Sequence, residues 1–381
     1  MNIKKLKLFD NFLRSVINKI QVFKTKKSDD VILPDQILII KLSAFGDSLC
    51  LIPSLRYFSK SFPDCKIDWL TTGRSSPKTF SEIKFIHEII IFPLNIFRAL
   101  IFLPSLIFKI KKYDLVIDCD QYYALSELIA LFSRRSVGFS TPIKGSNFSH
   151  SISYDPLLNE ILQFKLLFDE IPVPRNNSDV SFHADCLELT DNYQPTDFLK
   201  NAILNLDLQT KPLIVLYPGS GSNAKIRRWS ASNYIELSNF LSEKFTVVFA
   251  GGADEIDLKT ILSSSKKSID WIGKWSLTEW AWILRHHTSM FVGNDGGLFH
   301  LADSQGARTL GIFGPSLYSK WGSINPRSRH IEISSLECRP CLRGHLGQVA
   351  TVCARNDVAC INQITVSQVL AVFQDAIKYE I

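Results

Sequence analysis

Hydrophobic residues recur along the chain as short runs separated by stretches long enough for helices. Each run has the length of a buried strand, and this alternation is typical of βαβ units that build a parallel sheet. The runs lie at 37–40, 67–70, 89–92, 115–117 and 136–139, and again at 213–217, 246–250, 269–272, 290–292 and 309–313. The pattern therefore predicts an α/β protein with two parallel sheets.

The stretch between the two series is different. Residues 150–210 are less regular and rich in Asn, Asp and Pro, which indicates a connection between domains. A chain of 381 residues is also too long for one ordinary core. We therefore expect an N-terminal domain over 31–190 and a C-terminal domain over 191–381, with residues 1–30 as a separate segment.

Residues 1–30 contain eight basic and three acidic residues, and so account for most of the net charge of +6. Their apolar positions form one stripe of a predicted helix: Leu6, Phe9, Leu13, Val16, Ile20 and Phe23. Such a basic amphipathic helix suits an anionic membrane surface, and packing on the domain with solvated lysines is the alternative. Little charge is left to build a nucleic-acid-binding face, so no nucleic-acid partner is expected.

The most apolar stretch is Ile89–Phe108. It has nearly the length of a membrane span, but Pro93, Asn95, Arg98 and Pro104 interrupt it. We expect a strand at 89–92 and then a helix whose exposed face is unusually apolar. A membrane-spanning helix is the alternative.

The segment Ile39–Leu49 begins as a predicted strand and continues into a loop of small residues. The loop ends in an acid, because Asp47 follows Gly46. Glycine permits positive φ and lets a ligand approach the backbone, and Ser43 belongs to the same loop. The Asp47 carboxylate can take a proton from an attacking hydroxyl as a general base. The alternative is an N-cap that satisfies free amides of the next helix.

The second half contains a predicted anion site. Ser220 and Gly221 follow the strand at 213–217, and Lys225, Arg227 and Arg228 come soon after. Exposed amides with nearby cations suit a phosphate. The segment is neither a Walker A loop nor a complete dinucleotide fingerprint. A surface turn with solvated basic residues is the alternative.

Two further strand ends in this half have acids in glycine turns. Glu255 follows the turn at 250–253 and can accept hydrogen bonds from ribose hydroxyls, although an acid that only favours a helix start is the alternative. Asp295 precedes Gly296 and Gly297, and His300 follows on the next predicted helix. Together these turns predict a nucleotide-diphosphate pocket.

Two patterns suggest metal sites. Residues 118–120 have the sequence Asp-Cys-Asp, which matches the metal-binding pattern Asp-x-Asp. This short pattern is common by chance, and it lies in the N-terminal domain, away from the predicted nucleotide-diphosphate pocket. Four cysteines near the end of the chain could bind zinc in a tetrahedral site: Cys338, Cys341, Cys353 and Cys360. Free thiols or a disulfide are the alternatives. No apolar run with a cleavage site follows Met1, so the cytosol is the expected compartment.

The two acid-containing loops together resemble glycosyltransferase family 9, which contains the bacterial ADP-heptose–lipopolysaccharide heptosyltransferases. The resemblance covers roughly residues 37–373. It is carried by 40–53 (IKLSAFGDSLCLIP), 292–302 (VGNDGGLFHLA), 113–118, 218–221, 251–255 and 311–315, in the family's order.

The resemblance implies a GT-B fold, in which two Rossmann-like domains face a central cleft. Asp47 matches the family's proposed base and Glu255 its ribose contact, while Asp295, Gly297 and His300 match the loop around diphosphate and sugar. The implied enzyme transfers a sugar with inversion, most simply heptose from ADP-heptose, to a lipid-linked saccharide. It needs no catalytic metal or cofactor. It would work at the cytoplasmic face of the inner membrane, as a peripheral protein on an anionic surface.

The chain departs from the family pattern in two places. Gly296 stands where Ser or Thr is frequent, so one hydroxyl contact to phosphate is lost. The phosphate-binding cation is ambiguous among Lys225, Arg227 and Arg228. Another nucleotide-sugar donor, or a degenerate member that binds without turnover, therefore remain alternatives.

Overall fold

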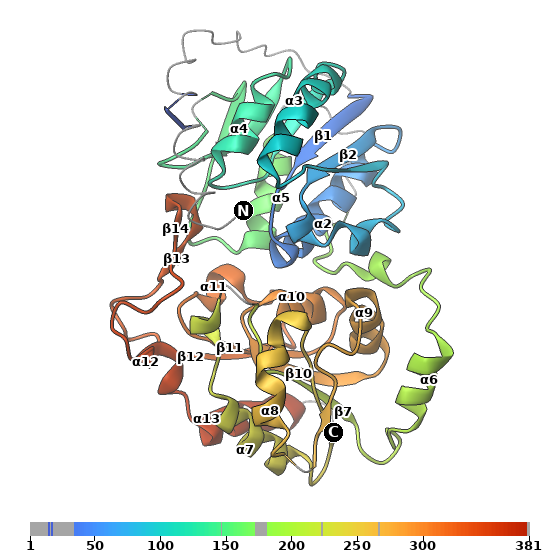
Figure 1. Cartoon of the computed structure of the whole chain (residues 1–381), viewed down its shortest axis with the longest axis vertical. Coiled ribbons are helices and arrows are strands. Elements are labelled where there is room, and N and C mark those ends of the chain that lie inside the picture. Colours follow the sequence, from blue (N-terminus) through green and yellow to red (C-terminus); the bar gives the residue numbers. More distant parts are fainter. Residues whose placement is uncertain are drawn as a thin grey trace. The chain divides into compact units, whose positions relative to one another are not determined.

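The computed structural model describes residues 14, 15, 17, 34–145, 147–171, 181–221, 224–265 and 267–378. The chain forms two compact units (Figure 1). Unit 1 comprises Met1–His183 and Arg343–Gln348, and unit 2 comprises Ala184–Leu342 and Val349–Ile381. The division falls after His183, whereas the boundary expected from the sequence lies after residue 190.

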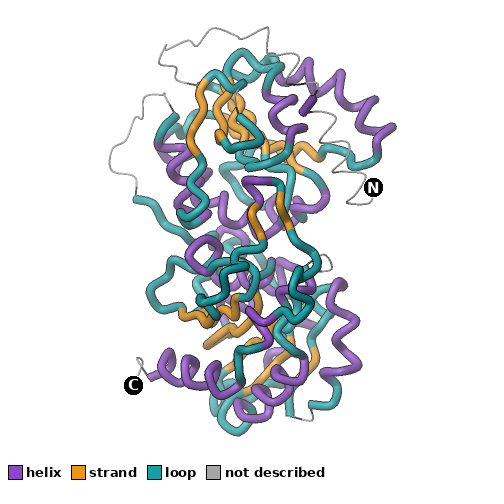
Figure 2. The backbone as a smooth tube through the Cα atoms, turned by 90° about the vertical axis from the view of Figure 1, so that its left-hand side faces the viewer, coloured by secondary structure: helices purple, strands orange, loops and turns teal. Residues whose placement is uncertain are grey.

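Unit 1 is built on a six-stranded parallel sheet with the order β3-β2-β1-β4-β5-β6. Its strands are β1 (Gln36–Ile40), β2 (Lys66–Thr71), β3 (Glu88–Ile91), β4 (Leu115–Asp118), β5 (Ser136–Ser140) and β6 (His150–Ser153). Its helices are α2 (Phe45–Ser61), α3 (Ile96–Ile110), α4 (Ala124–Ala130) and α5 (Glu160–Asp169). Figure 2 shows these strands with helices on both sides.

Unit 2 contains a second six-stranded parallel sheet, with the order β12-β11-β10-β7-β8-β9. Its strands are β7 (Leu213–Tyr217), β8 (Thr246–Phe249), β9 (Ile269–Asp270), β10 (Thr288–Asn294), β11 (Thr309–Phe313) and β12 (Arg329–Glu332). Its helices are α6 (Asp197–Leu204), α7 (Ala231–Leu241), α8 (Lys259–Leu262), α9 (Leu277–His286), α10 (Gly297–Ser304), α11 (Tyr318–Trp321), α12 (Ala359–Asn362) and α13 (Val366–Lys378). A short hairpin pairs β13 (Leu342–Arg343) with β14 (Gln348–Val349).

The central strands are apolar along most of their length because both faces of each sheet are covered by helices. In β1, Ile37 to Ile40 are all fully buried. Leu38 and Ile40 pack in one cluster with Leu106 of α3. The corresponding cluster of unit 2 joins β7 to α7 and α13. The uninterrupted apolar runs of the sequence therefore correspond to strands that are covered by helices on both faces of the sheet.

Both sheets have the same strand order when they are counted from their first strands, β1 and β7. In each, the order reverses between the first strand and the fourth: between β1 and β4 in unit 1, and between β7 and β10 in unit 2. Ligands of open α/β sheets bind at the carboxyl ends of the strands beside such a reversal. The topology therefore gives each unit one preferred place for a site.

The structure confirms the predicted pair of parallel sheets and corrects some local predictions. Residues 150–210 are more regular than expected, since they include β6, α5 and α6. The α5 helix packs on α2, where the rings of Phe168 and Phe58 lie 5.6 Å apart. The edge strand β12 and the β13–β14 hairpin were not predicted. These elements are short and lack the long apolar runs that mark the central strands.

Most of the predicted N-terminal helix lies outside the described residues. Of its positions that are described, Arg14 donates hydrogen bonds to the carbonyl oxygens of Tyr122 and Ile143. Ile17 is buried against Ala124 of α4. These contacts are those of a segment that packs on unit 1, as in the alternative interpretation of this segment.

The apolar stretch at 89–108 forms β3 and α3, as expected, and α3 is apolar on its exposed side. Among the described residues, no helix has both the length and the apolar character that a membrane crossing requires.

Candidate active site

The loop after β1 places Asp47 in the first turn of α2. The helix begins at Phe45 and its N-cap is Ala44, so Asp47 does not occupy the N-cap position of the alternative interpretation. Its side chain is 24% exposed, which leaves the carboxylate accessible. Gly46 lies inside the same helical turn, so the positive φ considered for it is wrong.

The buried side chain of Lys41 contacts Asp47. This side chain is completely buried, and its Nζ atom lies 3.3 Å from Oδ2 of Asp47 and 2.9 Å from Oδ1 of Asp120. Nζ also donates to the carbonyl oxygen of Ser43, at 2.6 Å. Burial alone would lower the pKa of Lys41, but the charges of Asp120 and Asp47 outweigh it and raise this pKa. Lys41 is therefore a buried cation that is fixed next to the loop after β1.

The Asp-x-Asp segment takes part in the same buried network. Oδ2 of Asp120 accepts a hydrogen bond from the amide of Leu42, at 2.8 Å. Asp118 lies 2.7 Å from the Nζ atom of Lys144, and both side chains are fully buried. Each carboxylate is thus paired with a lysine, which accounts for the motif without a metal. Neither Lys41 nor Lys144 was predicted, although a lysine at the end of a buried apolar run is an informative signal.

In unit 2, Glu255 joins two glycine turns. It lies on the short 3-10 helix Ala253–Leu258, and its carboxylate accepts hydrogen bonds from the amides of Gly221 and Gly252, at 2.8 and 2.9 Å. The residue is only 3% exposed. The Gly252 contact is that of an acid at a helix start, whereas the Gly221 contact comes from the loop after β7. A ribose contact would have to use the remaining lone pairs of the two oxygens.

The loop after β7 depends on this carboxylate. Gly221 has a φ of +80°, a left-handed conformation that glycine adopts without steric cost. A Cβ atom on Gly219 would lie 2.3 Å from Cγ of Glu255, so this position has room only for glycine. Ser220 is buried and donates to the carbonyl oxygen of Ala224, at 2.8 Å. The turn is therefore fixed by close contacts.

The three candidate cations have different partners. Lys225 and Arg228 both bind Asp257, at 2.8 and 3.0 Å, and Lys225 is exposed. Arg227 instead reaches the loop after β10, where its Nη1 atom lies 3.1 Å from Oδ2 of Asp295. Its Nε atom is buried and has no hydrogen-bond partner in the described structure. Of the three, Arg227 is the cation that contacts the loop after β10, whereas Nη2 of Arg228 lies 4.0 Å from Oε1 of Glu255.

Asp295 is the centre of this second cluster. It is buried, and besides Arg227 it accepts a hydrogen bond from Ser316, at 2.5 Å, and lies 3.6 Å from Nε2 of His300. Burial would raise the pKa of Asp295, but the Arg227 charge and the contacts with His300 and Ser316 lower it to about 2. Asp295 is therefore an anion that orients Arg227 and His300.

Gly296 is extended, with a φ of 175°, and Gly297 begins α10. A Cβ atom on Gly296 would lie 3.1 Å from the ring of Tyr217 and 3.3 Å from Cα of Ser220. The space that a serine or threonine side chain would need is therefore partly occupied by Tyr217. The departure from the family pattern has a structural reason in the neighbouring strand.

Asn294 connects the two strands that flank the strand-order reversal in unit 2. Its Nδ2 atom donates to the carbonyl oxygen of Gly219, at 3.0 Å, and its Oδ1 atom accepts from the amide of Trp229 and from the hydroxyl of Tyr234, both at 3.0 Å. Neither Asn294 nor Ser316 was predicted as a site residue from the sequence. A fully buried asparagine at a strand end is the only signal, and it is not visible without the burial.

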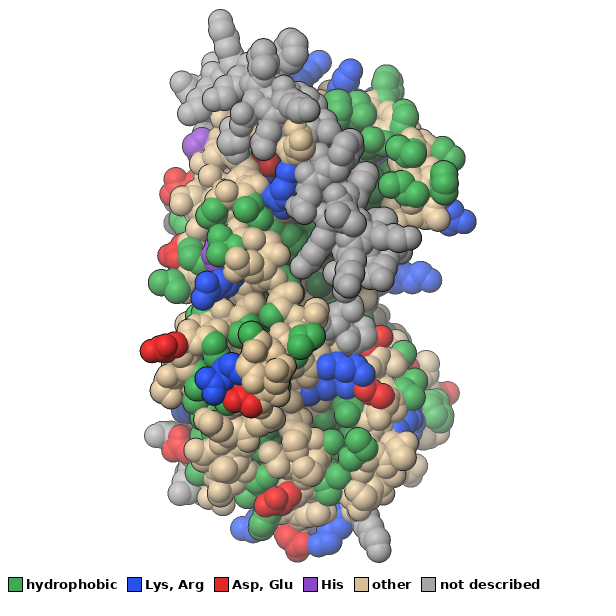
Figure 3. Space-filling view, turned by 60° about the vertical axis from the view of Figure 1, so that its left-hand side comes forward, with side chains coloured by type: hydrophobic (Ala, Val, Ile, Leu, Met, Phe, Trp, Pro, Cys, Tyr) green, Lys and Arg blue, Asp and Glu red, His purple; other side chains and the backbone are tan. Residues whose placement is uncertain are grey.

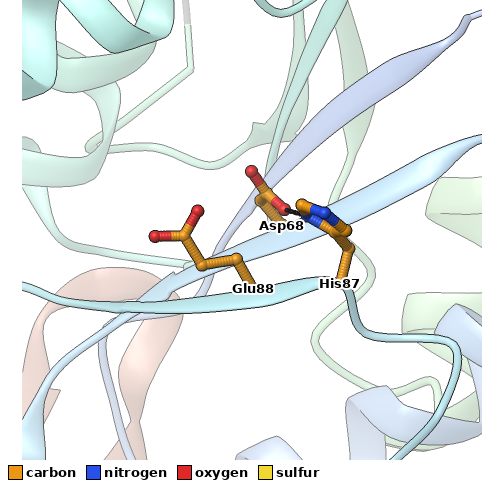
Figure 4. Close-up of side chains that lie close together, drawn as sticks. All are labelled: Asp68, His87 and Glu88. Carbon is orange, nitrogen blue, oxygen red and sulfur yellow. Dashed lines mark hydrogen bonds and ion pairs between the residues drawn. The ribbon is translucent and has the colours of Figure 1, made fainter.

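Among the described residues, the other potential metal ligands lie too far apart or already have protein partners. Within the described part of the chain, the cysteines form no disulfide, and the tail cysteines are not among the residues close enough to share a metal ion. Asp68, His87 and Glu88 are close enough (Figure 4). However, Asp68 already accepts hydrogen bonds from His87, Tyr113 and Gln36, and Glu88 pairs with Lys109.

Two parallel sheets, each with charged loops at the carboxyl ends of its central strands, define the GT-B class of α/β protein. The family model of glycosyltransferase family 9 (heptosyltransferase) matches residues 109–346, which is more than half of the chain. The chain belongs to this family, and the protein is a glycosyltransferase.

Solved structures show the same fold. E. coli ADP-heptose LPS heptosyltransferase II is similar with a TM-score of 0.65 and 19% identity, over 91% of this chain and 99% of that chain. A family 9 glycosyltransferase from Veillonella parvula DSM 2008 gives 0.71 and 16%, over 92% and 99%. E. coli heptosyltransferase WaaC with ADP gives 0.63 and 16%, over 90% and 99%. No curated protein sequence matches the chain.

Proposed function

We propose that the protein transfers heptose from ADP-heptose to a lipid-anchored saccharide of a lipopolysaccharide core, with inversion at the anomeric carbon. The family description and the similar heptosyltransferases support this donor. The observation that carries the proposal is the placement of Asp47. It is an accessible carboxylate in the first turn of α2, held by a buried lysine at the carboxyl edge of the first sheet.

In the proposed reaction, Asp47 accepts the proton of an acceptor hydroxyl as this oxygen attacks the anomeric carbon. The bond from that carbon to the diphosphate oxygen breaks at the same time, and ADP leaves with the electron pair. General-base assistance of this kind contributes about 10²- to 10⁴-fold in rate. Lys41 keeps a positive charge beside Asp47 and holds its carboxylate in place through an ion pair of 3.3 Å.

Arg227 is proposed as the cation that balances the charge on the departing diphosphate. Asp295 orients it, and the first amides of α10 are available to the same anion. Fixed donors at a developing charge are a large catalytic contribution, with single donors worth about 3 kcal/mol. Lys225 and Arg228, which are paired with Asp257, supply long-range positive charge.

The proposed site of action is the cytoplasmic face of the inner membrane, where the lipid-anchored acceptor would be found. The apolar exposed face of α3 supports a peripheral association with the anionic surface. We expect no nucleic-acid partner and no cofactor.

A different nucleotide-sugar is the second candidate donor, and Gly296 is the observation that favours it. The missing hydroxyl and the adjacent Tyr217 ring change the surface beside the predicted diphosphate loop. A thermal-shift panel with ADP-heptose and with ADP-, UDP- and GDP-hexoses distinguishes the two, because a ligand that binds the native state raises its melting temperature.

The decisive test is an Asp47→Asn variant in a purified transfer assay with ADP-heptose and a heptose-free core acceptor. We expect the turnover to fall by at least about 10²-fold while ADP affinity stays within about twofold. Asp197→Asn, which changes a 92% exposed carboxylate on α6 outside both candidate loops, is the matched control and should keep its turnover. Near-normal transfer by Asp47→Asn would exclude the proposed base.

A further inference from the structure

The helix α3 is apolar on two opposite sides. Its inner side packs on the core of unit 1 through Ala99, Phe102, Leu103, Leu106 and Ile110. Four large side chains point the other way: Phe97, Leu100, Ile101 and Phe108 are 74%, 61%, 80% and 67% exposed. We call these four residues the outer face of α3.

The outer face is a continuous stripe along the helix. Positions 97, 100, 101 and 108 follow helical spacing, and the exposed Pro104 lies between the two ends. A helix that is hydrophobic all round is normally buried on all sides. A folded protein also rarely presents large apolar side chains in one contiguous group without a partner. In the described structure no helix, strand or loop covers the outer face. We therefore expect it to bind a partner surface.

The charges around the outer face indicate which occupant. Between Ile96 and Lys112 the chain has four cations, Arg98, Lys109, Lys111 and Lys112, and no acidic residue. The Nζ atom of Lys112 lies 5.2 Å from the centre of the Phe108 ring. Of these cations, Lys109 pairs with Glu88 of β3. Figure 3 shows hydrophobic side chains gathered on a projecting part of unit 1, with basic side chains beside them.

We propose that the outer face of α3 inserts into the interfacial region of an anionic lipid bilayer, with Arg98, Lys111 and Lys112 at the level of the lipid phosphates. Aromatic and aliphatic side chains on one face with basic residues at its border are what interfacial helices use. The cations match the charge of anionic headgroups. The inference rests on the proposed function, because a lipid-anchored acceptor explains why this enzyme would bind a bilayer.

The position of α3 in the sheet fits this role. The helix follows β3, and the loop with Asp47 follows β1, so both start at the carboxyl edge of the same parallel sheet. Phe97 and Ile101, the two most exposed residues of the outer face, belong to the amino-terminal part of the helix, which is nearest that edge. A bilayer that contacts them would keep a lipid-anchored saccharide on the side of unit 1 that presents Asp47.

The test measures how the full-length protein distributes between solution and sedimented liposomes. The liposomes are phosphatidylcholine alone or phosphatidylcholine with about 30% phosphatidylglycerol. We expect wild type to bind the anionic liposomes at least about tenfold more strongly than the neutral ones. The double variant Phe97→Ser/Ile101→Ser should lose most of this binding, and Lys111→Glu/Lys112→Glu should lose its dependence on phosphatidylglycerol.

Phe240→Ser is the matched control, because Phe240 is an exposed phenylalanine of unit 2 with 57% exposure, outside α3. It should bind liposomes like wild type. All variants replace exposed side chains, and an unchanged circular-dichroism melting curve confirms that they fold. Equal liposome binding by wild type and the Phe97/Ile101 variant would overturn the proposal and would assign binding to another part of the chain.

Two further measurements separate this inference from the proposed function. Sedimentation velocity of wild type detects self-association, and a dimer that Phe97→Ser/Ile101→Ser dissolves without affecting liposome binding would assign the outer face to a second copy. Transfer from ADP-heptose to a delipidated acceptor should be the same in wild type and in the α3 variants. Failure of transfer in all proteins with normal liposome binding would reject the proposed reaction but leave the membrane surface supported.

Discussion

The Nζ atom of Lys41 lies 3.3 Å from the carboxylate of Asp47 and 2.9 Å from that of Asp120, and Lys41 and Asp120 are completely buried. Lys41 directly follows β1, Asp47 lies in the first turn of α2, and Asp120 follows β4 by two residues. One ammonium group thus ties the candidate base to both strands that flank the reversal of strand order in unit 1. The position of Asp47 depends on a contact made between strands that are distant in sequence.

Replacing Lys41 separates its effect on folding from its effect on the base. We expect Lys41→Met to cost about 3 to 5 kcal/mol in the free energy of unfolding, because it leaves Asp120 buried without its cation. In Lys41→Met/Asp120→Asn the buried charge is also removed, and most of the lost stability should return. Denaturant melts of the two variants measure this difference.

Transfer by the stable double variant should still be reduced by about tenfold or more, since Asp47 has lost the cation that holds its carboxylate in position. The separate changes in kcat and KM are the informative readout. In the double variant kcat should fall while the KM for ADP-heptose stays within about twofold, because the proposed donor loops lie in unit 2. Full activity of the double variant would show that Lys41 has only a structural role.

Sequence patterns predicted the scaffold of these sites better than their contacts. The apolar runs identify the central strands because helices cover both faces of each sheet. The acids Asp47, Glu255 and Asp295 lie in the loops or first helical turns that follow such runs. Which groups touch them is decided by the order of strands. The contact between Lys41 and Asp120 requires β1 and β4 to be neighbours, and local patterns do not contain that information.

The assignment of Arg227 as the phosphate cation can be tested against its neighbour. Arg227→Met should weaken ADP binding by about 10- to 100-fold, because a charge-assisted hydrogen bond is worth about 1.5 to 3 kcal/mol. Lys225→Met removes an exposed cation that pairs with Asp257, and should weaken binding by less than about threefold. Isothermal titration calorimetry with ADP compares the two.

Arg227→Lys is the control that separates loss of charge from loss of the guanidinium group. It keeps a cation beside the buried Asp295 but not the geometry of the guanidinium. It should retain the stability of wild type more closely than Arg227→Met and bind ADP with intermediate affinity. A larger loss in Lys225→Met than in Arg227→Met would transfer the phosphate-binding role to Lys225. The sequence left this choice open because only the fold shows which of the three cations contacts the loop after β10.

The close approach at Gly219 predicts that even one methyl group disturbs the donor site. In Gly219→Ala the new Cβ atom would meet Cγ of Glu255 at 2.3 Å and the Tyr217 ring at 2.6 Å. We expect a loss of about 1 to 3 kcal/mol in stability and a fall of more than about tenfold in ADP affinity, because Glu255 must move. Gly73→Ala, where no atom lies within 4 Å of the added Cβ, should change neither quantity appreciably. Equal effects of the two substitutions would show that the 219–221 turn is not fixed by Glu255.

Two carboxylates of the α10 region should affect the pH dependence of stability with opposite signs. Burial raises the pKa of Asp303 to about 6, although the hydrogen bond from Ser323 and the charge of His300 oppose the shift. The folded state therefore binds the proton more tightly than the unfolded state. This contribution to stability is fully present below the unfolded pKa of about 3.9 and is lost as the pH rises through about 6.

Asp303→Asn removes the charge that is buried above pH 6, and its amide oxygen can still accept the hydrogen bond from Ser323. Relative to wild type, it should gain on the order of 2 kcal/mol at pH 7.5 and little at pH 4. Asp295→Asn should behave in the opposite way, because the pKa of Asp295 is lowered to about 2. It should be less stable than wild type at neutral pH, and the difference should shrink as the pH falls from about 4 towards 2. Urea melts at several pH values measure both differences, and the same sign for the two variants would contradict the electrostatic account of this cluster.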